Sequence, residues 1–223
     1  MKRLLILLLL IGTSNIYSIT LKEVYKTAPT QGEYDKYLAL ETGVTYTGGL
    51  LIGPIYDPII DELSGPQGLN ARIEGNGAIL DLEGEQICIS FCNNKLDIDN
   101  CIIINGNIRY RGFNNEFGEV LPTGYVQYCT FYKPQDHAIR LQGTGGNITL
   151  ERNIFVDAVD TGDDFTHLTG VPMEWLPTGS NVAISIFYAT YGIPTLLDNW
   201  SYHSEEEINL DGTKHFVELC EYG

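Results

Sequence analysis

The sequence is poor in positive charge. It contains 13 Lys and Arg residues against 29 Asp and Glu residues, which gives a formal net charge of -16. A surface this acidic repels the phosphates of nucleic acids and of anionic membranes unless a local basic patch intervenes. We therefore expect no nucleic-acid partner, and the excess of acids by itself indicates little more than good solubility.

Long apolar runs are also absent. The longest, Leu4–Ile11, follows Lys2 and Arg3, and it is shorter than the about 20 residues that a helix needs to cross a bilayer. A basic start, a short apolar block and a small, polar end are typical of a secretory signal peptide. We expect residues 1–18 to be removed by cleavage after Ser18, and the mature protein to be secreted (extracellular, periplasmic or at the cell surface) without a membrane span.

The chain has only five cysteines, an odd number. It also lacks a Pro/Ser-rich linker that would divide it into domains. Cys88 and Cys92 lack a second pair with His at zinc-ligand spacing, so they do not predict a zinc site. The roughly two hundred residues after the signal are enough for a single all-β domain.

Short β-type runs fill residues 72–168. They are rich in Ile, Val, Tyr and Phe and are interrupted by Gly and Asn, as in "ICISF" and "CIIIN". No window has a convincing helical period, and hairpin pairs joined by Asn-Gly or Asp-Gly are scarce, which disfavours a sandwich.

A repeat organises these runs. Shifting the chain by about 25 to 31 positions, within the range of solenoid repeats, aligns "LDLEG" (80–84), "IRYRG" (108–112), "IRLQG" (139–143) and "THLTG" (166–170). Each pentad ends in Gly, and the first three have apolar residues at their first and third positions. A second column contains Cys101, Cys129 and Asn153, each followed by a short apolar run.

This pattern resembles the right-handed parallel β-helix of the pectate-lyase-like superfamily, in which each coil contributes three short strands and like residues stack in columns. The segment "NITLERNIF" (147–155) is typical of that family's second strand, turn and third strand. The resemblance covers roughly residues 72–170 and implies an all-β fold, a single-stranded right-handed parallel β-helix solenoid. It also implies that Asn153 stacks inward, with Cys101 and Cys129 in the same slot.

The two cysteines of this column have two interpretations. Small buried thiols are the simpler one, and a disulfide between Cys101 and Cys129 is the other.

The ends of the chain depart from the repeat. "TLKEVYKTA" (20–28) predicts a short amphipathic helix that caps the first coil, so residues 19–71 are assigned to an N-terminal cap and first turns. Residues 72–223 are assigned to the β-helix. Because the apolar pattern loosens after Gly170, we expect either loop-rich C-terminal coils or a chain truncated from a longer parent.

A charged column follows from the pentads. Because side chains alternate along a strand, the second position of each pentad faces outward: Asp81, Arg109, Arg140 and His167. Strands stack about 4.8 Å apart, which is similar to the length of a sugar unit, so this column predicts a groove for an extended polysaccharide. Arg109, Arg111 and Arg140 form a basic stripe suited to carboxylate and sulfate groups.

Acidic loops precede the last two pentads. "KPQDHA" places Asp136 and His137 before Arg140, and "DTGDDF" contributes Asp160, Asp163 and Asp164. Neighbouring carboxylates shift each other's pKa values apart, which suits acid/base chemistry or the binding of a hard cation such as calcium.

The resemblance assigns roles to these residues. In pectate-lyase-like enzymes acids hold calcium against a substrate carboxylate, and an Arg or Lys removes the adjacent proton. This implies Arg140 as the base, with His167 and then Lys133 as further candidates and Asp163 as a catalytic acid. Candidate calcium ligands are Asp160, Asp163 and Asp164, and candidate substrate-binding residues are Arg109, Arg111, Asp136, His137 and Asp81. "TGDDF" is similar to an element of polygalacturonases, but the other elements of that family are missing.

Several functions stay open. The leading hypothesis is a secreted protein that binds and cleaves an acidic polysaccharide by lyase or hydrolase chemistry. The alternatives are a non-catalytic, adhesin-like surface protein and the N-terminal part of a longer enzyme. The charged column could equally consist of surface charges that pair with one another. The acidic loops could equally be solvated turns. Trp175, Trp200 and Tyr202 are candidates either to stack on sugar rings or to pack a cap.

Overall fold

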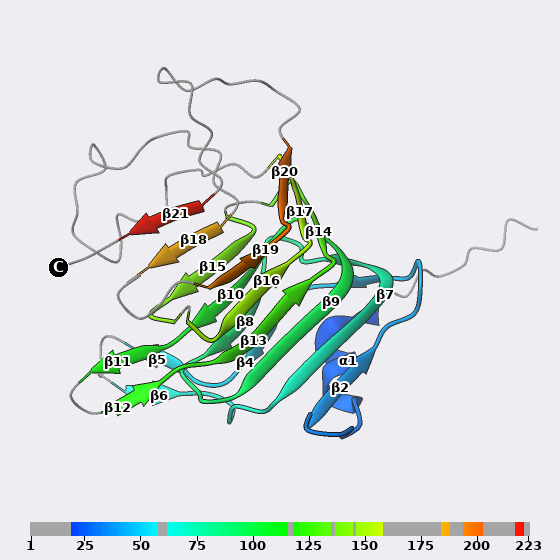
Figure 1. Ribbon diagram of the computed structural model, residues 1–223. Coiled ribbons are helices and arrows are strands. Elements are labelled where there is room, and N and C mark those ends of the chain that lie inside the picture. Colours follow the sequence, from blue (N-terminus) through cyan, green and yellow to red (C-terminus); the bar gives the residue numbers. More distant parts are fainter. Residues whose placement is uncertain are drawn as a thin grey trace, which may run out of the picture.

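The computed structural model describes residues 19–57, 62–115, 118–134, 137–144, 146–157, 184–187, 194–202 and 217–220. These residues form mainly β-strands, arranged in one large sheet, one small sheet and two hairpins (Figure 1). The predicted signal peptide and several C-terminal segments lie outside this set.

The large sheet has eleven strands. They are β1 (Ile19–Thr20), β2 (Lys36–Ala39), β3 (Thr45–Thr47), β7 (Ala71–Asp81), β9 (Lys95–Ile104), β13 (Thr123–Gln127), β14 (Thr130–Tyr132), β16 (Ile148–Glu151), β17 (Ile154–Val156), β19 (Thr195–Leu197) and β20 (Trp200–Tyr202). The small sheet has six strands. They are β4 (Leu50–Ile52), β8 (Gln86–Ser90), β10 (Asn107–Arg111), β15 (Ile139–Gln142), β18 (Ile184–Phe187) and β21 (Val217–Cys220).

All strand pairs within these two sheets are parallel, and the chain alternates between the sheets. From β8 it passes to β9, then to β10, to β13 and β14, to β15, to β16 and β17, and so on to β21. Two antiparallel hairpins, β5 (Ile55–Asp57) with β6 (Glu62–Ser64) and β11 (Phe113–Asn115) with β12 (Gly118–Val120), follow β4 and β10 (Figure 1). The predicted all-β class with parallel strands is confirmed.

The register confirms the central part of the predicted repeat. Ile108 pairs with Ile139, and Arg109 pairs with Arg140, across β10 and β15. The side chains of Ile108 and Ile139 are fully buried. The two pentads that contain these residues are therefore successive strands of the small sheet, as their spacing predicts.

The first pentad does not join this column as predicted. Asp81 ends β7 in the large sheet, where it pairs with Thr47 and Ile104, whereas the residue beside Arg109 in the small sheet is Cys88. The strand after β15 is β18, so Arg140 pairs with Ser185. His167, predicted in that place, lies outside the described residues. The error arises because apolar alternation is the same in both sheets and does not specify which sheet a run joins.

The Cys and Asn column is confirmed. Cys101, Cys129 and Asn153 each directly precede residues that pair across β9, β14 and β17. The side-chain oxygen of Asn153 accepts a hydrogen bond from Cys129 N at 3.0 Å, and its Nδ2 donates to Val126 O at 2.8 Å. Cys101 and Cys129 are free thiols in the structure, in agreement with the simpler of their two interpretations.

The interior between the sheets is apolar. Phe131 and Phe155, on neighbouring strands, stack with ring centroids 5.1 Å apart, and both are fully buried. Tyr110 is also fully buried and donates its hydroxyl hydrogen bond to Leu96 O at 2.8 Å. Each such side chain contributes about 1.5–3 kcal/mol by its burial.

Helix α1 (Leu21–Thr27) confirms the predicted N-terminal helix. It begins with a capping box, in which Thr20 and Glu23 satisfy each other's backbone N–H groups. Leu21 is fully buried in the core, and the helix contacts β1 and β2. Within the described residues no helix is long and apolar enough to cross a membrane.

Candidate functional site

The outer face of the small sheet carries a cluster of three arginines, which we call the arginine cluster: Arg109, Arg111 and Arg140. Tyr110 and Leu141 point into the core, so Arg109 and Arg140 lie on the opposite face of β10 and β15. An Nη2 of Arg109 donates a hydrogen bond to Gln142 Oε1 at 2.8 Å. The predicted juxtaposition of the arginines is therefore present.

The predicted exposure of this stripe is wrong. Arg109 is 9% exposed and Arg140 only 3% exposed, although both lie on the outer face of the sheet. Strand alternation predicts the face on which a side chain lies, but it does not predict what later covers that face. The two arginines therefore form part of an enclosed cluster instead of an open groove.

Arg111 is the most accessible member of the cluster. It is half-buried, and its Cζ lies 4.8 Å from the centroid of the Phe91 ring. Burial lowers the pKa of Arg111, and the positive charge of Arg140 lowers it further, while Cys88 acts in the opposite direction. Its Nε is buried and has no hydrogen-bond partner among the described residues. The guanidinium thus lies partly out of water and close to a second arginine, where a bound anion would stabilise its charge.

Cys88 belongs to the same face, and the repeat did not reveal it. It pairs with Arg109, and its side chain is 3% exposed. Burial raises the pKa of the Cys88 thiol to about 11, although Arg109 and Arg111 favour the thiolate. The thiol is therefore protonated at neutral pH, which disfavours a role as a nucleophile. The run "ICISF" is predicted as a strand but not as a member of the column, because it lacks the closing Gly.

Other predicted site residues are scattered or undescribed. His137 is fully buried, which disfavours a direct surface contact with a substrate. Asp81 accepts hydrogen bonds from Asn105 Nδ2 at 2.9 Å and from Glu83 N at 3.2 Å, at the end of a large-sheet strand. Lys133, in the turn after β14, lies with its Nζ 5.5 Å from the Tyr132 ring centroid.

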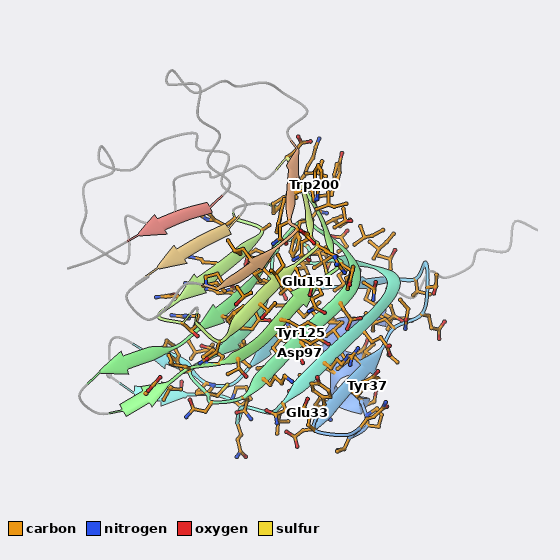
Figure 2. The ribbon with its side chains drawn as sticks, viewed as in Figure 1. Glu33, Tyr37, Asp97, Tyr125, Glu151 and Trp200 are labelled. Carbon is orange, nitrogen blue, oxygen red and sulfur yellow. The ribbon has the colours of Figure 1, made fainter. Side chains whose placement is uncertain are left out.

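The remaining predicted residues lie outside the described part of the chain: Asp136, Asp160, Asp163, Asp164, His167 and Trp175. Within the described part, no group of three His, Cys, Asp or Glu side chains could hold a metal ion. The calcium site thus stays a prediction. Trp200, on β20, is 73% exposed and does not pack into the core (Figure 2).

A second polar cluster lies on the outer face of the large sheet, where Figure 2 shows Tyr37, Asp97, Tyr125 and Glu151 following one another across the strands. Asp97 is fully buried. It accepts hydrogen bonds from Tyr34 Oη at 2.5 Å and from Tyr125 N at 3.0 Å, and Lys95 Nζ lies 3.2 Å from its Oδ2.

The electrostatics of Asp97 reflect its burial. Burial raises the pKa of this carboxyl, while Tyr34 and Lys95 counteract the shift. Burial, reinforced by the hydrogen bond to Asp97, raises the pKa of Tyr34 to about 12, so its hydroxyl remains a donor.

A neighbouring set of pairs extends this network. Arg72 Nη2 lies 2.9 Å from Asp99 Oδ2, and Tyr37 Oη donates to Glu74 Oε2 at 2.6 Å. Each of these side chains has a protein partner, although Arg72 Nε makes no hydrogen bond within the described residues. We interpret the network as a structural clamp that holds the segment before β2 against the sheet.

Comparisons with family models, with curated proteins and with solved structures found no match to this chain. The resemblance to the pectate-lyase-like superfamily therefore stays a prediction.

Proposed function

We propose that this chain is a secreted right-handed parallel β-helix protein, of the pectate-lyase-like kind, that binds an acidic polysaccharide. The β-helix is supported by the alternation of the chain between two parallel sheets and by the columns of like residues across successive strands. Each passage from the small sheet to the large sheet and back then corresponds to one coil.

The proposal of an anionic ligand rests mainly on the in-register pairing of Arg109 with Arg140. Adjacent strands lie about 4.8 Å apart, so the guanidinium groups of Arg109, Arg111 and Arg140 are concentrated in a small area of a strongly acidic protein. A planar guanidinium can bond two oxygens of one carboxylate or sulfate. A polymer with repeated anionic groups matches this arrangement.

The degree of burial indicates how each arginine contributes. Arg111 is half-buried, so it is the arginine of the cluster that can meet an anion directly. Arg109 and Arg140 are more enclosed, so they act mainly through their charge, which is screened less in the protein interior than in water.

Binding to matched polymers tests this proposal. Titration calorimetry compares polygalacturonate, which carries carboxylates, with its fully methyl-esterified form, which is neutral. We expect binding of the first only, and weakening as salt is raised. Equal binding to both polymers, or to neither, overturns the proposal.

A non-catalytic, adhesin-like role is favoured over cleavage by one observation. A general base must come within hydrogen-bond distance of the proton that it removes, and the candidate base Arg140 is only 3% exposed. Incubation with polygalacturonate and measurement of the absorbance of unsaturated products separates the two. Absence of product supports binding alone, whereas product that disappears in Arg140→Ala restores the assignment of Arg140 as the base.

A further inference from the structure

Phe91 occupies a backbone position that is glycine in the next strands of the small sheet. Its N–H donates to Arg111 O at 2.9 Å, and Gly112 N–H donates in the same way to Gln142 O at 2.8 Å. Gly143 follows Gln142 and takes the same position one strand further on. The equivalence is therefore set by the register and by the backbone hydrogen bonds.

The backbone conformation at this position suits glycine better than phenylalanine. Phe91 has a φ of 45° and Gly143 a φ of 63°, whereas the φ of Gly112 is not positive. Both values lie in the left-handed region, which glycine adopts readily and which strains a residue with a bulky side chain. A phenylalanine here carries a conformational cost that a glycine would avoid, and such strain is often found where a side chain serves a function.

The side chain of Phe91 contacts the arginine cluster. The Arg111 guanidinium lies over its ring at 4.8 Å from the centroid, within the range of a cation–π interaction. A carboxylate in this place would also stabilise Arg111, but it would cancel the positive charge. An aromatic face stabilises the cation and leaves its charge and its N–H donors for a ligand.

We propose that Phe91 is a positioning residue of the polysaccharide site, and that its ring orients the Arg111 guanidinium toward a carboxylate of a uronate unit. This role depends on the proposed function. It explains why a strained aromatic residue directly follows β8, whereas Gly112 and Gly143 directly follow β10 and β15.

Three substitutions test the role of Phe91. Phe91→Gly removes both the ring and the strain, Phe91→Leu keeps an apolar side chain without a π face, and Phe91→Tyr keeps the π face. We expect a polygalacturonate affinity about 3- to 10-fold weaker for the first two and near that of the unmodified protein for Phe91→Tyr. The melting temperature of Phe91→Gly should equal or exceed that of the unmodified protein, because the backbone strain is gone.

The outcomes separate this role from the proposed function. Unchanged affinity of Phe91→Gly overturns the role of Phe91 and leaves the polysaccharide site in place. A large fall in the melting temperature of Phe91→Gly also overturns it, since Phe91 is then structural. Failure of Phe91→Tyr to restore the affinity overturns the cation–π argument. Absence of polygalacturonate binding by the unmodified protein overturns both proposals.

Discussion

Arg109 and Arg140 lie directly opposite one another on β10 and β15, on the face of the small sheet that points away from the core. Two guanidinium groups at paired positions of neighbouring strands concentrate positive charge on this face of the sheet. In a chain of net charge -16, such a local concentration of positive charge is the feature that most favours an anionic ligand.

Substitution of Arg111 tests the direct contact with the ligand. Arg111→Gln keeps a polar side chain, although a shorter one, and removes the charge and most donors, so we expect polygalacturonate affinity to fall roughly 10- to 100-fold. Titration calorimetry measures the change. Lys26→Gln, at an exposed position of α1, is the matched control and should bind as the unmodified protein does. Equal affinities of the two variants contradict the role of Arg111.

The column of Cys101, Cys129 and Asn153 is expected to be important for stability. Asn153 is fully buried, and Asn153→Ala leaves Cys129 N and Val126 O without their partners. We expect the free energy of unfolding to fall by about 2–4 kcal/mol in urea titrations. Asn147→Ala, at an exposed turn, should change it by less than about 0.5 kcal/mol. A similar effect of both substitutions would show that the buried hydrogen bonds contribute little.

The buried carboxyl of Asp97 gives a pH dependence of a particular sign. Its folded-state pKa is raised above the ordinary value of 3.8 by burial, so the folded state takes up the proton before the unfolded state does. Its contribution to the free energy of unfolding therefore falls as pH rises from 3.8 through the folded-state pKa, and it is constant above that value.

The comparison with Asp97→Asn isolates this contribution. The difference in free energy of unfolding, unmodified protein minus variant, should decrease across this acidic range and then become flat. Denaturant titrations at a series of pH values measure it. A difference that increases with pH would mean that Tyr34 and Lys95 outweigh burial.

The thiols of the described cysteines should be unreactive in the folded protein. Cys88, Cys92, Cys101 and Cys129 are buried, and burial raises the pKa of the first two. Iodoacetamide at pH 8, followed by mass spectrometry of the peptides, should find these four cysteines unmodified without denaturant and modified in urea. Rapid modification of Cys88 in the folded state would contradict its placement.

The sequence was sufficient to predict the parts of the fold that depend on local spacing. The alternation in "IRYRG" and "IRLQG" predicts which residues face inward, and the repeat length predicts that Arg109 lies beside Arg140. The Cys101, Cys129 and Asn153 column follows from the same spacing. Asp81 was misplaced because a run of alternating residues does not reveal which of two parallel sheets it joins.

Burial and long-range pairing could not be predicted in this way. Arg140 and His137 are buried, and strand alternation does not specify this. The hydrogen bond between Tyr34 and Asp97 joins residues 63 positions apart. No repeat or motif contains both, so the clamp on the large sheet was not foreseen. Phe91 was not predicted as a site residue, because the run "ICISF" lacks the closing Gly that defines the repeat.

A crystal structure of the protein with a short polygalacturonate oligosaccharide tests the central proposal most directly. The account predicts a uronate carboxylate within hydrogen-bond distance of the Arg111 guanidinium, with the sugar chain crossing β10 and β15 on the outer face of the small sheet. An oligosaccharide bound elsewhere, or a complex in which no carboxylate contacts Arg109, Arg111 or Arg140, would contradict it.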